Sequence, residues 1–110
     1  MEKKNKLVLA GDYWSVNDSF GRGHPSIITK RKKGKVEHIS ITHSPSTRRK
    51  RNIKLRKNPK KGDKDDSYIV PKVAVARIAD LGKKHQDMSI KDPVDKSIIR
   101  KMKHSRNKNK

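Results

Sequence analysis

The spacing of apolar residues changes once along this chain, and that change limits the folds open to it. Residues 36–42, VEHISIT, alternate between apolar and polar side chains, which is typical of a strand with one buried face. Ile39 and Ile41 are expected on the buried face and Thr42 on the other. Between residues 90 and 102, apolar residues recur every four positions, which indicates one face of a helix. The sequence therefore predicts a mainly β chain with a helix after the strands.

Turn residues divide the first part of the chain into short segments. Apolar runs lie at residues 7–14 and 25–29, and the second follows a glycine-rich turn, GRGHP. Residues 30–35, KRKKGK, predict a hairpin around Gly34. Residues 67–78, SYIVPKVAVARI, are expected to form one strand, or two strands broken at Pro71, because proline cannot donate to a central ladder. Five or six short strands are expected.

The helix is expected over about residues 92–104. Asp92 is the predicted N-cap, Pro93 suits the first helical position, and Asp95 places negative charge in the first turn. Its apolar face is predicted from the four-residue spacing and comprises Ile90, Val94, Ile98, Ile99 and Met102. Residues 105–110 are expected to be a frayed basic tail.

The composition limits both the core and the partners. Only 29% of residues are hydrophobic and the chain has 110 residues, so a single domain with a small closed or half-closed barrel is the expected arrangement. Dimerisation would enlarge so thin a core. Thirty-one Lys and Arg against eleven Asp and Glu give a formal net charge of +20, which favours a polyanionic partner, nucleic acid above all. Cysteine is absent and no apolar run is long enough to span a membrane, so a cytoplasmic protein without a membrane partner is expected.

A long basic insertion is predicted within the barrel, at residues 44–66 of the barrel segment 7–80. Residues 48–61 of it contain no acid, and an alternating stretch, NIKLR, is a candidate strand. The residues predicted to bind a nucleic-acid backbone are Arg48, Arg49, Lys50, Arg51, Lys54, Arg56 and Lys57. An aromatic stacking surface is poorly supported, because the chain has one Trp, two Tyr and one Phe.

Taken in order, these segments resemble the MazF/PemK (Kid-like) family of toxin–antitoxin endoribonucleases. GDYW is similar to the opening strand of the family, and GRGHPSIIT to the segment in which a loop ends in Arg-Pro and a strand begins. VEHISIT resembles the next strand, which ends in a threonine, and DDSYIVPKVAVARIADL resembles a later one. The resemblance spans residues 7–104 and implies an α+β, mainly β fold: a small SH3-like barrel of the MazF/CcdB type with a C-terminal amphipathic helix.

The resemblance also implies an activity, the metal-independent cleavage of single-stranded RNA by attack of a 2′-hydroxyl on the adjacent phosphate. The threonine of the family corresponds to Thr42, and the position of its arginine is occupied here by His24. Histidine can act as an acid or a base near neutral pH, and Arg22, two residues earlier, could supply the positive charge that the arginine would carry. His43 is a further acid/base candidate, although alternation points it to the face opposite Thr42. A homodimer and an acidic antitoxin are the partners that the resemblance implies.

Two alternatives remain open from the sequence. The same barrel could bind RNA or DNA without cutting it, as a ribosome-associated or mobile-element protein, since His24 departs from the family pattern. A CcdB-like toxin that targets a protein such as gyrase is disfavoured by the positive charge. No cofactor is expected. A metal site at His38 and His43 is also not expected, because alternation separates them and no carboxylate or cysteine accompanies them.

Overall fold

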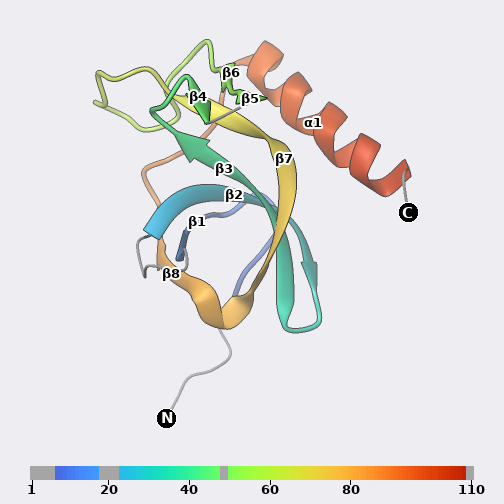
Figure 1. The fold of residues 1–110 in the computed structure, drawn as a ribbon. Helices are drawn as coiled ribbons and strands as arrows, with labels where there is room; N and C mark the ends of the chain where they lie inside the picture. The colour runs from blue at the N-terminus through green and yellow to red at the C-terminus, as the bar shows by residue number, and fades with distance from the viewer. Residues whose placement is uncertain (1–6, 18–22, 48–49, 109–110) are drawn as a thin grey trace.

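The computed structural model of the protein describes residues 7–17, 23–47 and 50–108. Within these residues the elements are β1 (Tyr13–Asn17), β2 (Gly23–Lys32), β3 (Lys35–Thr42), β4 (Ser46–Thr47), β5 (Lys50–Arg51), β6 (Ile53–Lys54), β7 (Tyr68–Arg77), the 3₁₀ turn η1 (Ile78–Asp80), β8 (Leu81–Lys84) and α1 (Pro93–Lys108). Figure 1 shows the strands curling around one another and α1 lying beside β7. The predicted α+β, mainly β fold with a C-terminal helix is confirmed.

Six strands form one antiparallel sheet in the order β6-β7-β3-β2-β1-β8, and β4 and β5 form a separate two-stranded ribbon. The predicted hairpin is present between β2 and β3, where Gly34 adopts φ 71°. A β-bridge between Lys60 and Met88 joins the segments that follow the two edge strands, β6 and β8. The ends of the curled sheet are thereby brought together on one side of the molecule.

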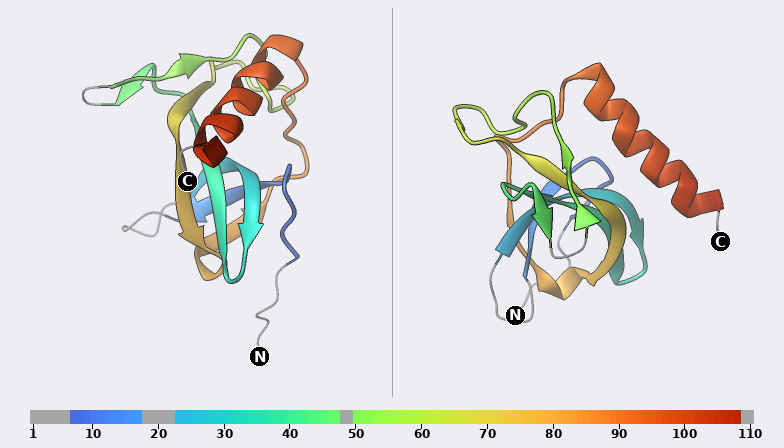
Figure 2. Two further views of the ribbon diagram at one scale, coloured as in Figure 1. Left: turned by 90° about the vertical axis from the view of Figure 1, so that its right-hand side faces the viewer. Right: turned by 45° about the horizontal axis from the view of Figure 1, so that its top comes forward.

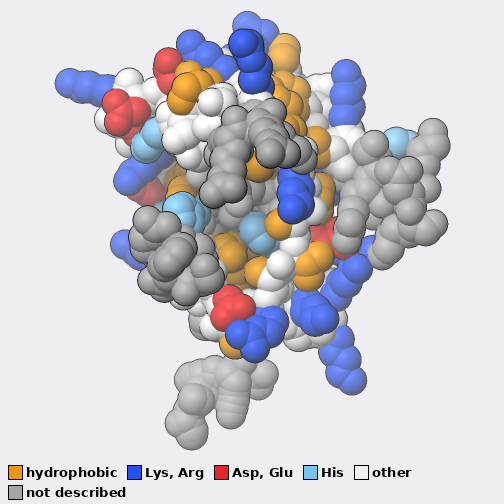
Figure 3. Space-filling model, viewed as in Figure 1, with side chains coloured by type: hydrophobic (Ala, Val, Ile, Leu, Met, Phe, Trp, Pro, Cys, Tyr) orange, Lys and Arg blue, Asp and Glu red, His pale blue; other side chains and the backbone are white. Residues whose placement is uncertain are grey.

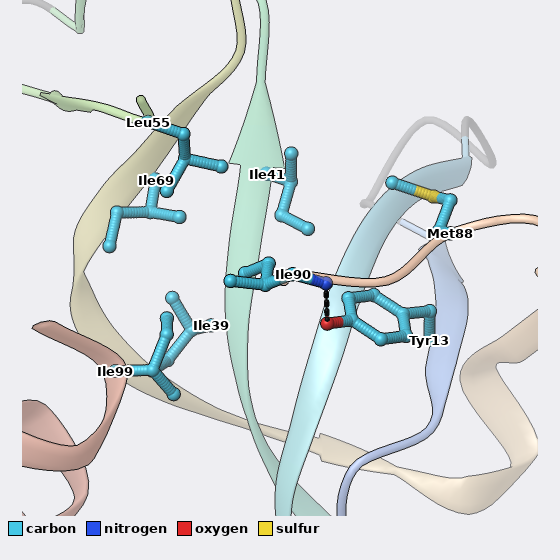
Figure 4. Packing of buried hydrophobic residues seen from close by; sticks show 8 residues of the cluster. All are labelled: Tyr13, Ile39, Ile41, Leu55, Ile69, Met88, Ile90 and Ile99. Atoms are coloured by element: carbon cyan, nitrogen blue, oxygen red, sulfur yellow. Dashed lines mark hydrogen bonds between the residues drawn. The ribbon is translucent and has the colours of Figure 1, made fainter. Parts of the chain in front are cut away.

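The core consists of two clusters on the two faces of the sheet. The larger one contains the buried side chains of Tyr13, Ile39, Ile41, Leu55, Ile69, Met88, Ile90 and Ile99, which Figure 4 shows pointing toward one another. The smaller one contains Val8, Trp14, Ile28, Val36, Ile78 and Leu81. Both aromatic residues of the first strand, Tyr13 and Trp14, are therefore core residues. No helix in the described part of the chain is long and apolar enough to cross a membrane.

The hydroxyl of Tyr13 connects β1 to the segment before α1. It accepts a hydrogen bond from the backbone N–H of Ile90 at 2.8 Å, in a buried setting (Figure 4). We expect Tyr13→Phe to lower the free energy of unfolding by about 1–2 kcal/mol, because the N–H of Ile90 would remain buried without an acceptor. Urea unfolding measures the change. Tyr68→Phe, on a half-buried tyrosine, is the control and should change it by less than about 0.5 kcal/mol; equal losses in the two variants would contradict the prediction.

β7 is one strand and is not broken at Pro71. Its register with β3 shifts between Ile39 and Ile41, so that Val70–Lys72 lie opposite the single residue Ser40. β6 pairs with Tyr68 and Ile69, so among the residues that the structure describes β7 has no partner on that side at Pro71. Proline has no N–H to donate, but at this register shift, beyond the end of β6, no ladder hydrogen bond from residue 71 is required. The strand therefore continues through Pro71.

Three other boundaries differ from the sequence predictions. The apolar run at residues 7–14 is mostly irregular, and β1 begins only at Tyr13. β8 follows a 3₁₀ turn and was not predicted, because its sequence, LGKK, carries one apolar residue. α1 continues to Lys108, so the part of the predicted tail up to residue 108 is helical, and the C-terminal half of the helix extends beyond the sheet (Figure 2).

The first turn of α1 buries an aspartate where an apolar residue was expected. Val94 is 44% exposed, whereas Asp95 is fully buried. Asp92 caps the helix by accepting hydrogen bonds from the N–H groups of Val94 and Asp95, as its predicted N-cap role requires. The Asp95 carboxylate accepts from the N–H of Arg56 at 2.9 and 3.0 Å and from that of Lys57 at 3.1 Å. These contacts tie the basic insertion to the helix.

Candidate functional site

A cavity of about 420 Å³ opens where β2 begins, where β3 ends, and where the segments that follow β6 and β8 approach. Its lining is His24, Pro25, Ile41, Thr42, His43, Ser44, Asn58, Lys60, Asp63, Ser67, His85 and Met88. We call it the histidine cavity. Figure 3 shows histidine side chains on this face of the molecule, with acidic side chains nearby and lysine and arginine side chains around the edge. The cavity thus combines titratable groups with a cationic surrounding.

His24 and Thr42, the pair selected from the sequence, both line the histidine cavity. His24 is exposed and lies in β2 opposite Val16 of β1. Thr42 is the last residue of β3, is half-buried, and accepts a hydrogen bond on Oγ1 from the N–H of Ser44 at 3.2 Å. Two residues distant in sequence are therefore presented at one opening. Arg22 lies outside the described residues.

His43 lines the same cavity as Thr42, contrary to the expectation that alternation would separate them. Period-two alternation holds only within a strand, and β3 ends at Thr42, so the orientation of the next residue is set by the turn that follows. The Nε2 atom of His43 lies 2.9 Å from Oδ2 of Asp63. The insertion, from which only basic residues were selected as site residues, thus also contributes a carboxylate to this cavity.

The Asp63 carboxylate is itself held in place. Its Oδ1 accepts a hydrogen bond from the N–H of Asp65 at 3.0 Å, in a turn where Gly62 adopts φ 84°. This backbone hydrogen bond, and then the one from His43, lower the pKa of Asp63 below its ordinary value. Asp63 is therefore ionised at neutral pH and can only accept, so Nε2 of His43 carries the proton in this pair. The Nδ1 atom of neutral His43 then has a lone pair available to a ligand.

His85 was missed by the sequence reasoning and also lines the cavity. It follows β8, an element that the sequence did not predict, and its Nε2 lies 2.7 Å from Oγ of Ser15. Burial is the main cause that lowers the pKa of His85, and the nearby Lys60 and Lys83 lower it further, while Asp87 opposes them. Neutral His85 therefore persists to lower pH than an exposed histidine. The signal in the sequence was a histidine at a basic turn, which is too common to be selective.

A second hollow of about 340 Å³ shares His24, Ile41 and Thr42 with the histidine cavity and extends toward His38. His38 is buried, its Nδ1 lies 3.1 Å from Oγ of Ser26, and burial lowers its pKa. A neutral, hydrogen-bonded histidine beneath the opening is a structural group, and its face agrees with the alternation predicted for β3.

His43, Asp63 and Asp65 place three potential metal-ligating atoms within 4.8 Å of one another. The sequence argument against a metal at His43 assumed that no carboxylate accompanies it, and that assumption is wrong. His43 and Asp65 are exposed, and Asp63 already accepts hydrogen bonds from His43 and from a backbone N–H. The hydrogen-bond network accounts for this arrangement, and an exposed acidic group of this kind is common without an ion.

The basic insertion is distributed around the cavity and does not line it as a block. Lys54 pairs with Asp66 at 3.4 Å, and Arg56 lies 3.7 Å from Asp92. Lys57 lines a neighbouring cavity, whereas Lys60, not selected from the sequence, lines the histidine cavity. Of the remaining predicted contacts, Arg51 is exposed in β5 and Lys50 belongs to the same strand, while Arg48 and Arg49 lie outside the described residues.

No protein-family model and no curated protein matches this sequence. Among solved structures, the chain is similar to an endoribonuclease in complex with its cognate antitoxin, from a mycobacterial species. The TM-score is 0.56 and the identity 14%, over 86% of this chain and 87% of that one. At this identity the likeness shows the fold alone. The antiparallel sheet and C-terminal helix described above are thus a fold that a toxin endoribonuclease also has.

Proposed function

We propose that the protein is a toxin-like endoribonuclease that cleaves single-stranded RNA in the histidine cavity. The observation that carries the proposal is that His24, Thr42 and His43, selected from the sequence alone, line one opening together with Lys60. Acid/base groups, a hydroxyl donor and a cation are what the 2′-hydroxyl reaction requires. The similarity in fold to an endoribonuclease supports the proposal independently of these side chains.

In this reaction the 2′-oxygen forms a bond to the adjacent phosphorus while the bond from phosphorus to the 5′-oxygen breaks. A base takes the 2′ proton and an acid gives a proton to the leaving 5′-oxygen, so the products are a 2′,3′-cyclic phosphate and a 5′-hydroxyl. His24 and His43 are the acid/base pair. The Thr42 hydroxyl and the Lys60 ammonium donate to the phosphate oxygens, where negative charge develops. Arg22 is a further proposed cation.

The proposed partners are single-stranded RNA, a second copy of the chain, and an acidic antitoxin. The mycobacterial endoribonuclease of similar fold was solved with its cognate antitoxin, and a net charge of +20 would attract an acidic protein over long range. A cytoplasmic location follows from an RNA substrate. The reaction needs no cofactor, because proton transfer and phosphate binding are supplied by the side chains named above.

The test is to incubate the protein with a mixed-sequence single-stranded RNA in EDTA and to map the ends produced. We expect 5′-hydroxyl ends, and a loss of cleavage of about 10²-fold or more in both His24→Ala and Thr42→Ala. His104→Ala, on an exposed histidine of α1, is the matched control and should cleave like the unchanged protein. Activity lost in EDTA and restored by a divalent ion would instead place a metal in the mechanism, with His43, Asp63 and Asp65 as its ligands.

A second candidate function is RNA binding without cleavage on the same barrel. It is favoured by one observation, that an exposed histidine stands where the family resemblance would place arginine. Salt-sensitive binding of RNA that yields no new ends at any pH between 5 and 9 would support this function over the enzyme. A protein-targeting toxin of the CcdB type has no comparable observation in its favour.

A further inference from the structure

Another cavity, of about 560 Å³ and distinct from the hollow near His38, lies next to the histidine cavity. Its lining includes three lysines, Lys57, Lys61 and Lys91. We call it the lysine cavity. Asn58 and Met88 line both cavities. The bridge between Lys60 and Met88 runs between them, and the N–H of Ser89 donates to the carbonyl of Pro59 at 2.8 Å. The two cavities are therefore neighbours across one short, hydrogen-bonded strip of backbone.

The three lysines project from backbone that is fixed by hydrogen bonds. The N–H of Lys57 donates to the buried Asp95, and Lys91 directly precedes the N-cap residue Asp92. Lys61 lies in a tight turn closed by the bond from the N–H of Asp63 to the carbonyl of Lys60, at 3.3 Å. The positions of the three charges are thus set by the fold, although each ammonium remains on a flexible side chain.

These charges are not neutralised within the described part of the chain. The ion pairs there involve other residues, and Asp87 is the acidic residue that lines the lysine cavity beside the three lysines. A cavity with three lysines and one aspartate is suited to an anion with several negative charges or to a repeating anion. A strand of RNA held in the histidine cavity would present such an anion next to it.

We propose that the lysine cavity is a subsite that binds the RNA backbone next to the phosphate cleaved in the histidine cavity. The strand crosses the Lys60–Met88 bridge, with Lys60 on the reactive phosphate and Lys57, Lys61 and Lys91 on phosphates beyond it. This inference rests on the proposed function for the identity of the strand. It assigns the location of the flanking phosphates, which the excess of positive charge alone does not give.

The binding test uses a single-stranded oligonucleotide carrying 2′-deoxyribose throughout, which has no attacking hydroxyl. Its affinity is measured at several salt concentrations for the unchanged protein and for Lys57→Ala/Lys61→Ala/Lys91→Ala. Each phosphate contact on a single strand contributes about 0.7 to the slope of log affinity against log salt, so the triple variant should lower that slope by about 2. The matched control is Lys30→Ala/Lys33→Ala/Lys35→Ala, three exposed lysines at the β2–β3 hairpin, which should leave the slope nearly unchanged.

Cleavage provides the second readout. We expect the first triple variant to raise KM for an RNA of eight nucleotides by about tenfold or more, because it loses contacts to neighbouring phosphates. It should leave cleavage of a dinucleotide, which has one phosphate, within about twofold. Equal effects of the two triple variants on the slope would overturn the subsite, even if the protein cleaves RNA. A difference between their slopes without any cleavage would instead support the subsite and overturn the proposed enzyme.

Discussion

His43→Ala is expected to slow RNA cleavage by about 10²–10⁴-fold, the usual contribution of a positioned acid/base group. The Nε2 atom of His43 donates to Asp63 at 2.9 Å, which leaves Nδ1 to exchange a proton with the RNA. The side chain is 57% exposed, so substrate can reach it. Single-turnover rates with the protein in excess measure the chemical step, and RNA affinity should change by less than about threefold, because alanine removes no permanent cation.

Two variants of Asp63 separate orientation from charge. Asp63→Asn keeps an oxygen that can accept from Nε2 but removes the negative charge, whereas Asp63→Ala removes both. Without the carboxylate, the hydrogen bond from Nε2 of His43 loses its charged acceptor and weakens, so Asp63→Asn should lower the cleavage rate by a smaller factor than His43→Ala. Asp63→Ala should lower the rate more than Asp63→Asn, because the imidazole then loses its fixed orientation as well.

His104→Ala is again the control, since that histidine lies on α1 and does not line the cavity. If His43→Ala and His104→Ala cleave at the same rate, His43 has no part in the proton transfer. Unchanged cleavage rates in Asp63→Asn and Asp63→Ala, together with a slow His43→Ala, would assign His43 to the reaction but remove Asp63 as its positioning residue.

The sequence predicted the regular parts of this fold because their signals are local. The alternation of β3 and the N-cap of α1 each depend on residues within a few positions, so the strand and the start of the helix were both predicted, although both faces of β3 are buried. β8 could not be predicted, because its one buried residue, Leu81, has no alternating neighbours. The prediction that Val94 is buried was wrong for a different reason. Asp95 is buried in its place, because its carboxylate accepts hydrogen bonds from the distant residues Arg56 and Lys57, and these tertiary contacts override the helical spacing of apolar residues.

The candidate site was predicted in part for the same reason. His24 and Thr42 were selected by a resemblance that covers neighbouring segments, and both line one cavity. His85 and Asp63 reach the same cavity from β8 and from the insertion, and their approach depends on long-range contacts such as the Lys60–Met88 bridge. No spacing in the sequence indicates that bridge. Which acid/base groups on the long connections reach the cavity, here His85 and Asp63, can therefore be learned only from the folded chain.

Asp95→Ala is expected to lower the free energy of unfolding by about 3 kcal/mol, the largest effect on stability of any single substitution proposed for this chain. The carboxylate is fully buried and accepts hydrogen bonds from two backbone N–H groups of the insertion. Hydrogen bonds to a charged group contribute about 1.5–3 kcal/mol each, and alanine would leave both donors without an acceptor. Removing an acid from the first turn of α1 adds a smaller loss. Urea unfolding followed by circular dichroism measures the change.

Asp66→Ala is the matched control, because Asp66 is 62% exposed and forms a surface ion pair with Lys54. Its free energy of unfolding should change by less than about 1 kcal/mol. Asp95→Asn should fall between the two variants, since one amide oxygen can still accept from the N–H of Arg56. If Asp95→Ala were no less stable than Asp66→Ala, the insertion would not be held to α1 by this carboxylate. Contacts other than those of Asp95 would then have to hold Lys57 and Lys91 at the lysine cavity.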